Sequence, residues 1–269
     1  MLLKRIVLFG GKGGVGKSTL SCALSLKLSS FGKTLLLSLD PMHSLSGILK
    51  IEVPPEPREV YPNLFACELD AQKVAREYVD RVLENLRAVL SPKALEGFLR
   101  FASILYQSPT SLETASLDRL ADYIMQGDYE YIILDFAPTG NMLRILNTID
   151  LLKDWFGWIV EVAKEHRRIS SYLGREEKLL DMLLEREKKV KTLKKTFEEK
   201  GILFAVARDE ELSIEEAKRL LSYKGFSYSF MVMNACDKGE DFYVPPVEKP
   251  YGIENLLKLN VEPLLEVVL

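Results

Sequence analysis

Residues 10–19 bring five glycines, two lysines and two hydroxyl side chains together in the order GGKGGVGKST. Because glycine has no Cβ, the backbone N–H groups of such a loop can converge on a single phosphate group. Lys17 would bridge the β- and γ-phosphates, Ser18 would bind Mg²⁺, and Thr19 would reach the α-phosphate. The segment predicts an ATP-binding loop formed by Gly11, Lys12, Gly13, Gly14, Val15, Gly16, Lys17, Ser18 and Thr19.

Two carboxylates follow apolar runs, Asp40 in DPMHSL and Asp135 after YIIL. A carboxylate at the position of Asp40 can orient or deprotonate the water that attacks the γ-phosphate. An Asp-Pro pair also forms turns, and this alternative stays open for Asp40. Asp135 would hold Mg²⁺ directly or through a water, so the predicted metal set is Ser18, Asp40 and Asp135.

These residues need a scaffold in which strand ends meet at one edge. Apolar runs alternate with helical patterns, which is typical of a parallel sheet covered on both faces. The sequence thus predicts an α/β fold, a P-loop NTPase with a mostly parallel sheet flanked by helices. The expected strands are 4–9, 34–39, 64–69, 130–136, 201–208 and 229–235. The proline-rich segment 52–63 is expected to be a surface connector.

Two stretches, 71–129 and 141–200, are too long for simple crossovers and carry helical patterns. We expect them to pack together as an α-helical subdomain inserted in a single P-loop ATPase domain, 1–269. The charge-dense run 164–200 is expected to be an amphipathic helix with a solvated charged face.

Composition argues against several classes of protein. A net charge of −3 gives no electrostatic footprint for nucleic acid, so no nucleic-acid partner is expected. The three cysteines are isolated and predict neither disulfides nor a zinc or iron–sulfur site. No apolar run approaches the length of a membrane span. We expect a cytoplasmic protein, and peripheral attachment to a membrane stays open.

The sequence resembles the arsenite-pump and tail-anchored-protein targeting ATPases. The resemblance is carried by Lys12 ahead of Lys17, by DPMHSL at 40–45, and by DFAPTGNMLR at 135–144. It implies a homodimer that closes with ATP, in which Lys12 reaches the partner subunit's nucleotide. The implied catalytic residues are Lys12, Lys17 and Asp40, with ATP and Mg²⁺ as cofactors.

The same resemblance places Asn234 at the adenine edge, with Pro246 near other adenine contacts. A polar residue that merely ends a strand is the alternative for Asn234. The chain departs from the family pattern at Phe136 and Asn141, where threonine and histidine are common, and it lacks the paired cysteines that share zinc across many dimers.

Apolar residues gather at 95–106 and 142–159, around both tryptophans. The resemblance implies that such helices form a groove for a hydrophobic helical client, while packing inside a subdomain is the simpler alternative. We expect a targeting or chaperone ATPase for clients such as tail-anchored proteins, working with a membrane receptor. The alternatives are a peripheral subunit of an arsenite or antimonite efflux pump and a partitioning-type regulator. The residues expected to contact a client are Phe98, Phe101, Leu105, Leu146, Trp155 and Trp158.

Overall fold

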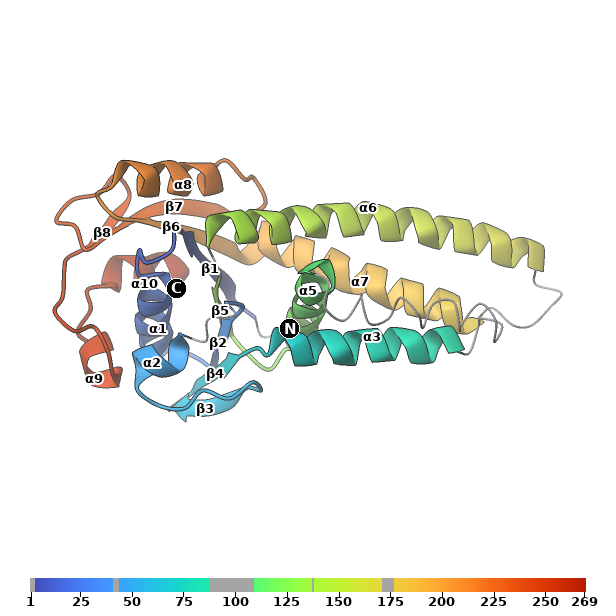
Figure 1. The fold of residues 1–269 in the computed structure, drawn as a ribbon, viewed down its shortest axis with the longest axis horizontal. Helices are drawn as coiled ribbons and strands as arrows, with labels where there is room; N and C mark the ends of the chain where they lie inside the picture. The colour runs from blue at the N-terminus through green and yellow to red at the C-terminus, as the bar shows by residue number, and fades with distance from the viewer. Residues whose placement is uncertain (1–2, 41–43, 88–108, 137, 171–176) are drawn as a thin grey trace. The chain divides into compact units, whose positions relative to one another are not determined.

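The computed structural model describes residues 3–40, 44–87, 109–136, 138–170 and 177–269 (Figure 1). The chain divides into two compact units. Unit 1 comprises Met1–Leu69, Tyr123–Arg144 and Lys195–Leu269, and unit 2 comprises Asp70–Asp122 and Ile145–Lys194. No helix among the described residues is both long and apolar enough to cross a membrane.

Unit 1 is built on an eight-stranded sheet with the order β3-β4-β2-β5-β1-β6-β7-β8. Neighbouring strands are parallel except for β3, which runs antiparallel to β4. Its central strands are continuous apolar runs because both faces of the sheet are buried. The strands are β1 Arg5–Gly11, β2 Thr34–Ser38, β3 Arg58–Tyr61, β4 Leu64–Glu68, β5 Tyr131–Asp135, β6 Gly201–Ala207, β7 Tyr228–Asn234 and β8 Phe242–Val244.

Both outermost strands of the sheet differ from the sequence prediction. The segment 52–63 was expected to be a connector only, yet β3 lies inside it. Its four residues fall between Pro57 and Pro62, and a strand at the edge of a sheet needs ladder partners on one side only. At the other edge β8, with three residues, is too short to give a periodic pattern.

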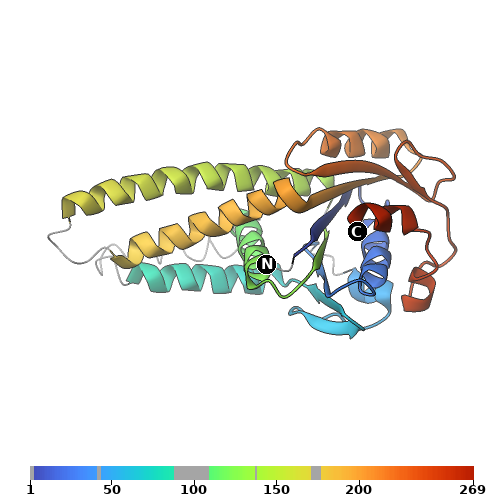
Figure 2. The same cartoon turned by 180° about the vertical axis from the view of Figure 1, so that it is seen from behind.

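Helices cover both faces of this sheet. Helix α1 contacts β1, β2 and β5, whereas α8 contacts β1, β6 and β7. Figures 1 and 2 show α1 and α10 together on one side of the sheet and α8 on the other. A buried cluster that includes Val7, Phe9, Leu24, Phe204 and Val268 fills the α1 side. The helices are α1 Lys17–Leu28, α2 Leu45–Leu49, α8 Glu211–Leu221, α9 Ile253–Leu256 and α10 Glu262–Val268.

Unit 2 is formed by helices. Helix α6 begins in the part of the chain that belongs to unit 1, shortly after β5, and most of its length belongs to unit 2. The described helices are α3 Ala71–Arg87, α5 Pro109–Gln126, α6 Thr139–Ser170 and α7 Glu177–Lys200.

A buried charge cluster lies inside unit 2. Asp118 on α5 pairs with Arg186 and, at 3.3 Å, with Lys189, both from α7. Lys189 also lies 2.6 Å from Asp122, and the Arg186 guanidinium stands 4.4 Å from the ring centre of Tyr78. The expectation that α7 turns its charges to solvent is therefore wrong for Arg186 and Lys189. Their partner Asp118 is distant in sequence, so the local pattern could not reveal the pairing.

Candidate nucleotide-binding site

The phosphate loop connects β1 to α1, as the glycine and lysine pattern predicts. Gly11 has φ 144° and Gly16 has φ 99°, both in the region that favours glycine. A Cβ at Gly11 would collide with the carbonyl oxygen of Val206 on β6, and one at Gly16 with the side-chain amide of Asn234. Both glycines are therefore required by backbone conformation and by space.

Lys17 begins α1 and is buried. Its Nζ donates a hydrogen bond to the backbone oxygen of Lys12, over 3.1 Å. Burial lowers the pKa of Lys17, and the nearby carboxylates of Asp135 and Asp40 work against that shift. The ammonium group is thus held under the loop without an ion pair among the described residues, as a group that receives an anionic ligand would be.

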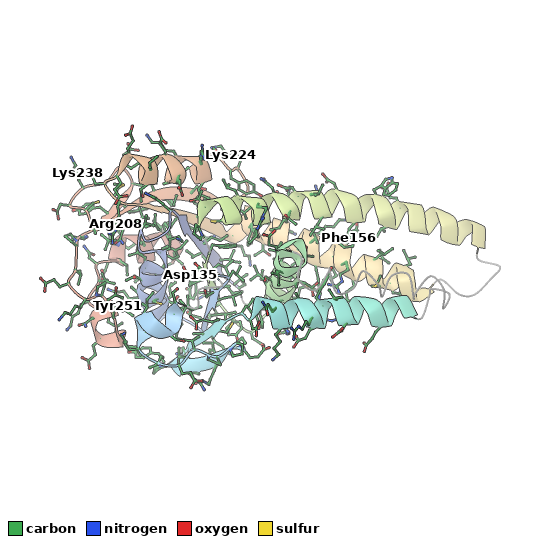
Figure 3. All side chains as sticks on the ribbon, viewed as in Figure 1. Asp135, Phe156, Arg208, Lys224, Lys238 and Tyr251 are labelled. Atoms are coloured by element: carbon green, nitrogen blue, oxygen red, sulfur yellow. The ribbon has the colours of Figure 1, made fainter. Side chains whose placement is uncertain are left out.

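Asp135 ends β5 and is fully buried (Figure 3). Neither of its carboxylate oxygens accepts a well-formed hydrogen bond from the described residues. Burial raises the pKa of Asp135 to about 7, although the Ser18 hydroxyl and Lys17 favour the charged form. A buried carboxylate without a well-formed hydrogen bond is costly, and a divalent cation would relieve that cost. Asp135 and Ser18 therefore fit a metal such as Mg²⁺.

The segment after β2 is tied both to the phosphate loop and to β4. Ser44 donates from its hydroxyl to the Ser18 hydroxyl oxygen at 3.1 Å. Buried Glu68, the last residue of β4, accepts hydrogen bonds from the Leu45 N–H at 2.5 Å and from the Ser46 hydroxyl at 2.8 Å. These bonds fix the start of α2, and the Asp40 side chain lines the same cavity as Ser18.

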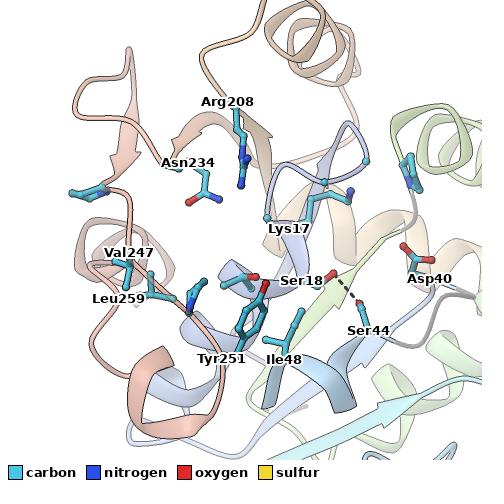
Figure 4. A pocket seen from close by; sticks show the side chains of 18 residues that line it. Lys17, Ser18, Asp40, Ser44, Ile48, Arg208, Asn234, Val247, Tyr251 and Leu259 are labelled. Carbon is cyan, nitrogen blue, oxygen red and sulfur yellow. Dashed lines mark hydrogen bonds between the residues drawn. The ribbon is translucent and has the colours of Figure 1, made fainter. Parts of the chain in front are cut away.

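One cavity of about 510 Å³ extends from Lys17, Ser18 and Asp40 to an apolar end (Figure 4). Asn234, at the end of β7, donates from Nδ2 to the carbonyl oxygen of Val15 at 2.7 Å, which leaves Oδ1 able to accept. The lining residues are Gly13, Gly14, Gly16, Lys17, Ser18, Thr19, Asp40, Ser44, Ile48, Pro138, Arg208, Asn234, Ala235, Pro245, Val247, Pro250, Tyr251 and Leu259.

Several lining residues were missed by sequence reasoning. Arg208 follows β6 directly, and β6 pairs with β7 so that Ala207 is opposite Met233. The rule that ligands bind at the carboxyl ends of parallel strands could have identified Arg208 beside Asn234. Tyr251 and Leu259 follow no such rule. Pro246, predicted near the adenine, does not line the cavity, whereas its neighbour Pro245 does.

The residues predicted to contact a client differ in their burial. Leu146 is fully buried, which corrects its assignment to a client surface, because no client could reach its side chain. Trp158 is 62% exposed. Outside the described residues or side chains lie Phe98, Phe101, Leu105 and Trp155.

The cysteines are scattered. Cys22 and Cys67 are buried, and Cys236 is partly exposed. Within the described part of the chain, no three His, Cys, Asp or Glu side chains gather as metal ligands would.

Comparisons with known proteins identify relatives of this chain. A family model described as anion-transporting ATPase matches residues 4–235. Putative arsenical pump-driving ATPase 2 of Aquifex aeolicus is 34% identical, over 86% of this chain and 79% of that protein. A putative arsenical pump-driving ATPase of Prosthecochloris vibrioformis is 30% identical, over 86% of this chain and 60% of that protein. An ATPase ASNA1 homolog of Entamoeba dispar is 28% identical, over 62% and 53% respectively. The chain spans less than two thirds of the length of the last two relatives.

Proposed function

Because this chain belongs to the anion-transporting ATPase family, we propose that it binds ATP with Mg²⁺ in the cavity between the phosphate loop and Asn234, and hydrolyses it. The observation that carries the proposal is the pair of buried, opposite charges beside the glycine loop. Lys17 suits a triphosphate and Asp135 suits a metal ion, and neither forms an ion pair among the described residues.

We assign each residue of the site a role in ATP binding or hydrolysis. The loop N–H groups, the amino end of α1 and Lys17 hold the phosphates. Ser18 and Asp135 hold the metal, which when bound neutralises charge on the phosphate oxygens. Asp40 orients the attacking water and accepts its proton, since it lines the phosphate end of the cavity. Asn234 offers its free oxygen to the exocyclic amine of adenine.

Replacing Asp40 tests the assignment of the water-activating carboxylate. We expect Asp40→Asn to bind ATP normally and to lower turnover about 10²- to 10⁴-fold, the usual contribution of a general base. The matched control is Asp128→Asn. Asp128 is exposed and precedes β5, whereas Asp135 lies at the other end of β5. Nearly normal turnover in Asp40→Asn would show that another group activates the water.

We further propose that two copies dimerise around their nucleotides, with Lys12 of each reaching the other's phosphates. Lys12 is partly exposed and does not line its own subunit's cavity. Sedimentation velocity in the presence of a non-hydrolysable ATP analogue should detect a dimer, and Lys12→Gln should weaken it. A protein that stays monomeric at saturating analogue would contradict this arrangement.

We propose that the dimer handles an apolar helical client through unit 2. Leu151 is 70% exposed and Trp158 is 62% exposed on α6, and seven residues apart they lie on the same side of that helix. Two large exposed apolar side chains on one helix face are suited to contact an apolar helix.

A crosslinking experiment tests this surface. A photoreactive group at position 158 should crosslink to a transmembrane-helix peptide, and the yield should change when ATP is added. The same group at Lys224, an exposed residue of unit 1, is the positional control. Equal yields at both positions, unaffected by ATP, would remove the client proposal.

A second candidate is a subunit that drives a metalloid pump, because two of the relatives described above carry that name. A trivalent metalloid is soft and prefers about three thiolates. The two buried cysteines and the partly exposed Cys236 form no such group among the residues that the structure describes. The pump hypothesis therefore predicts stimulation of ATPase activity by antimonite through a site shared between chains, and unchanged activity would count against it.

A further inference from the structure

Lys12 has a counter-ion within its own subunit. Its Nζ lies 3.4 Å from Oε2 of Glu210, a residue 198 positions away in the chain. The Lys12 side chain is 35% exposed and that of Glu210 is 58% exposed, so the pair is open to solvent. An ion pair in such a place is weak enough to be exchanged for a stronger anionic partner.

The backbone of Glu210 is held firmly. Glu210 is the last residue before α8, and its carbonyl oxygen accepts hydrogen bonds from the N–H groups of Ser213 and Ile214, both at 3.0 Å. Buried Ser213 in turn accepts a hydrogen bond at its hydroxyl oxygen from the Arg208 N–H. The carboxylate therefore projects from a fixed point, and only its side-chain torsions are free.

Glu210 is one of three consecutive exposed acids, together with Asp209 and Glu211. Of these three, only Glu210 forms an ion pair with Lys12 among the described residues. The contact is thus specific to one position and is not a general attraction to an acidic segment.

We propose that Glu210 is a positioning residue that keeps Lys12 on its own subunit until the dimer closes on ATP. This inference rests on the proposed nucleotide-dependent dimer. In that dimer Lys12 meets the partner subunit's phosphates, which carry more charge than one carboxylate. By two-fold symmetry closure exchanges two Lys12–Glu210 pairs, one in each subunit, so the effect on dimerisation is the square of the effect on one pair.

The test compares Glu210→Gln with Glu211→Gln, its neighbour in the first turn of α8. Dimerisation is measured by sedimentation with a non-hydrolysable ATP analogue at low and high salt. We expect Glu210→Gln to tighten the dimer about tenfold at low salt, from about threefold per pair, and the gain to shrink at high salt. Glu211→Gln should stay close to the wild type. An unchanged or weaker dimer in Glu210→Gln overturns the inference.

A double variant separates this role from a general effect of charge. In a Lys12→Gln background, Glu210→Gln should no longer change dimerisation, because the side chain it acts through is gone. An undiminished effect there would show that Glu210 does not act through Lys12. If the wild type forms no dimer with the analogue, the proposed nucleotide-dependent dimer fails as well. If it dimerises without any effect of Glu210→Gln, only this inference fails.

Discussion

The two units treat buried charge in opposite ways. In unit 2, Asp118, Arg186 and Lys189 are all buried, and the carboxylate of Asp118 pairs with both cations. In unit 1, Lys17 and Asp135 are also buried, yet neither forms an ion pair among the described residues. Every charge of the unit 2 cluster has a partner of opposite charge within the protein. Lys17 and Asp135 in unit 1 have no such ion-pair partner among the described residues.

This difference separates structural charges from functional ones. Burying a charge without a partner costs several kcal/mol, so such a group persists only where something else compensates it. At the phosphate loop the proposed nucleotide and metal ion would provide that compensation. In unit 2 it comes from the neighbouring helix, and the charges there need no ligand.

The largest effect is expected from replacing Asp135, which tests whether the buried charge of unit 1 lacks a partner within the chain. Asp135→Asn should lower turnover at least about 100-fold, because the metal loses a carboxylate. The same change should stabilise the ligand-free protein by about 1 kcal/mol, since an unpaired buried charge is removed. Steady-state assays and thermal melts at pH 8 measure the two quantities. A less stable ligand-free variant would show that Asp135 is compensated within the chain.

Removing Asp118 should have the opposite result. Asp118→Asn removes the carboxylate that pairs with Arg186 and one of those that pair with Lys189, and it should cost about 3 kcal/mol of unfolding free energy. Asp154→Asn, an exposed aspartate of the same unit, should change stability by less than about 0.5 kcal/mol. Urea denaturation followed by circular dichroism compares the two. Equal midpoints would mean that the unit 2 cluster contributes no more than a surface pair.

An effect of similar size sharpens the comparison inside unit 2. Phe156 is buried and lies near Trp158 in sequence on α6, whereas Trp158 is exposed. Phe156→Ala should cost about 3 kcal/mol, but Trp158→Ala should change stability little. Only Trp158→Ala should weaken binding of an apolar helical peptide, as fluorescence anisotropy would show. Loss of stability in Trp158→Ala would place its ring in the interior.

The smallest expected effect concerns the apolar end of the cavity. Asn234→Ala removes the bond to Val15 and the contact proposed for adenine, and it should weaken ATP binding about tenfold, or about 1.4 kcal/mol. Isothermal titration calorimetry with ATP and GTP is the measurement. Equal losses for both nucleotides would assign Asn234 to the loop alone rather than to base recognition.

Much of unit 1 could be predicted because its determinants are local. Apolar runs gave the six inner strands, and the order of glycines and lysines gave the loop. What failed depends on partners distant in sequence. Strand β3 exists because β4 offers it an edge, and Arg186 is buried because Asp118 lies across the helix interface. Tyr251 reaches the cavity from a segment with no motif of its own.

The hydrogen bond from Asn234 to Val15 has one more consequence. It fastens the loop after β1 to the end of β7 before any nucleotide arrives. Nucleotide binding should therefore need little rearrangement of the protein. The association rate of the nucleotide should be set mainly by diffusion, and the heat capacity change on binding should be small. The site is thus largely preformed, and differences in affinity among nucleotides should appear in their dissociation rates.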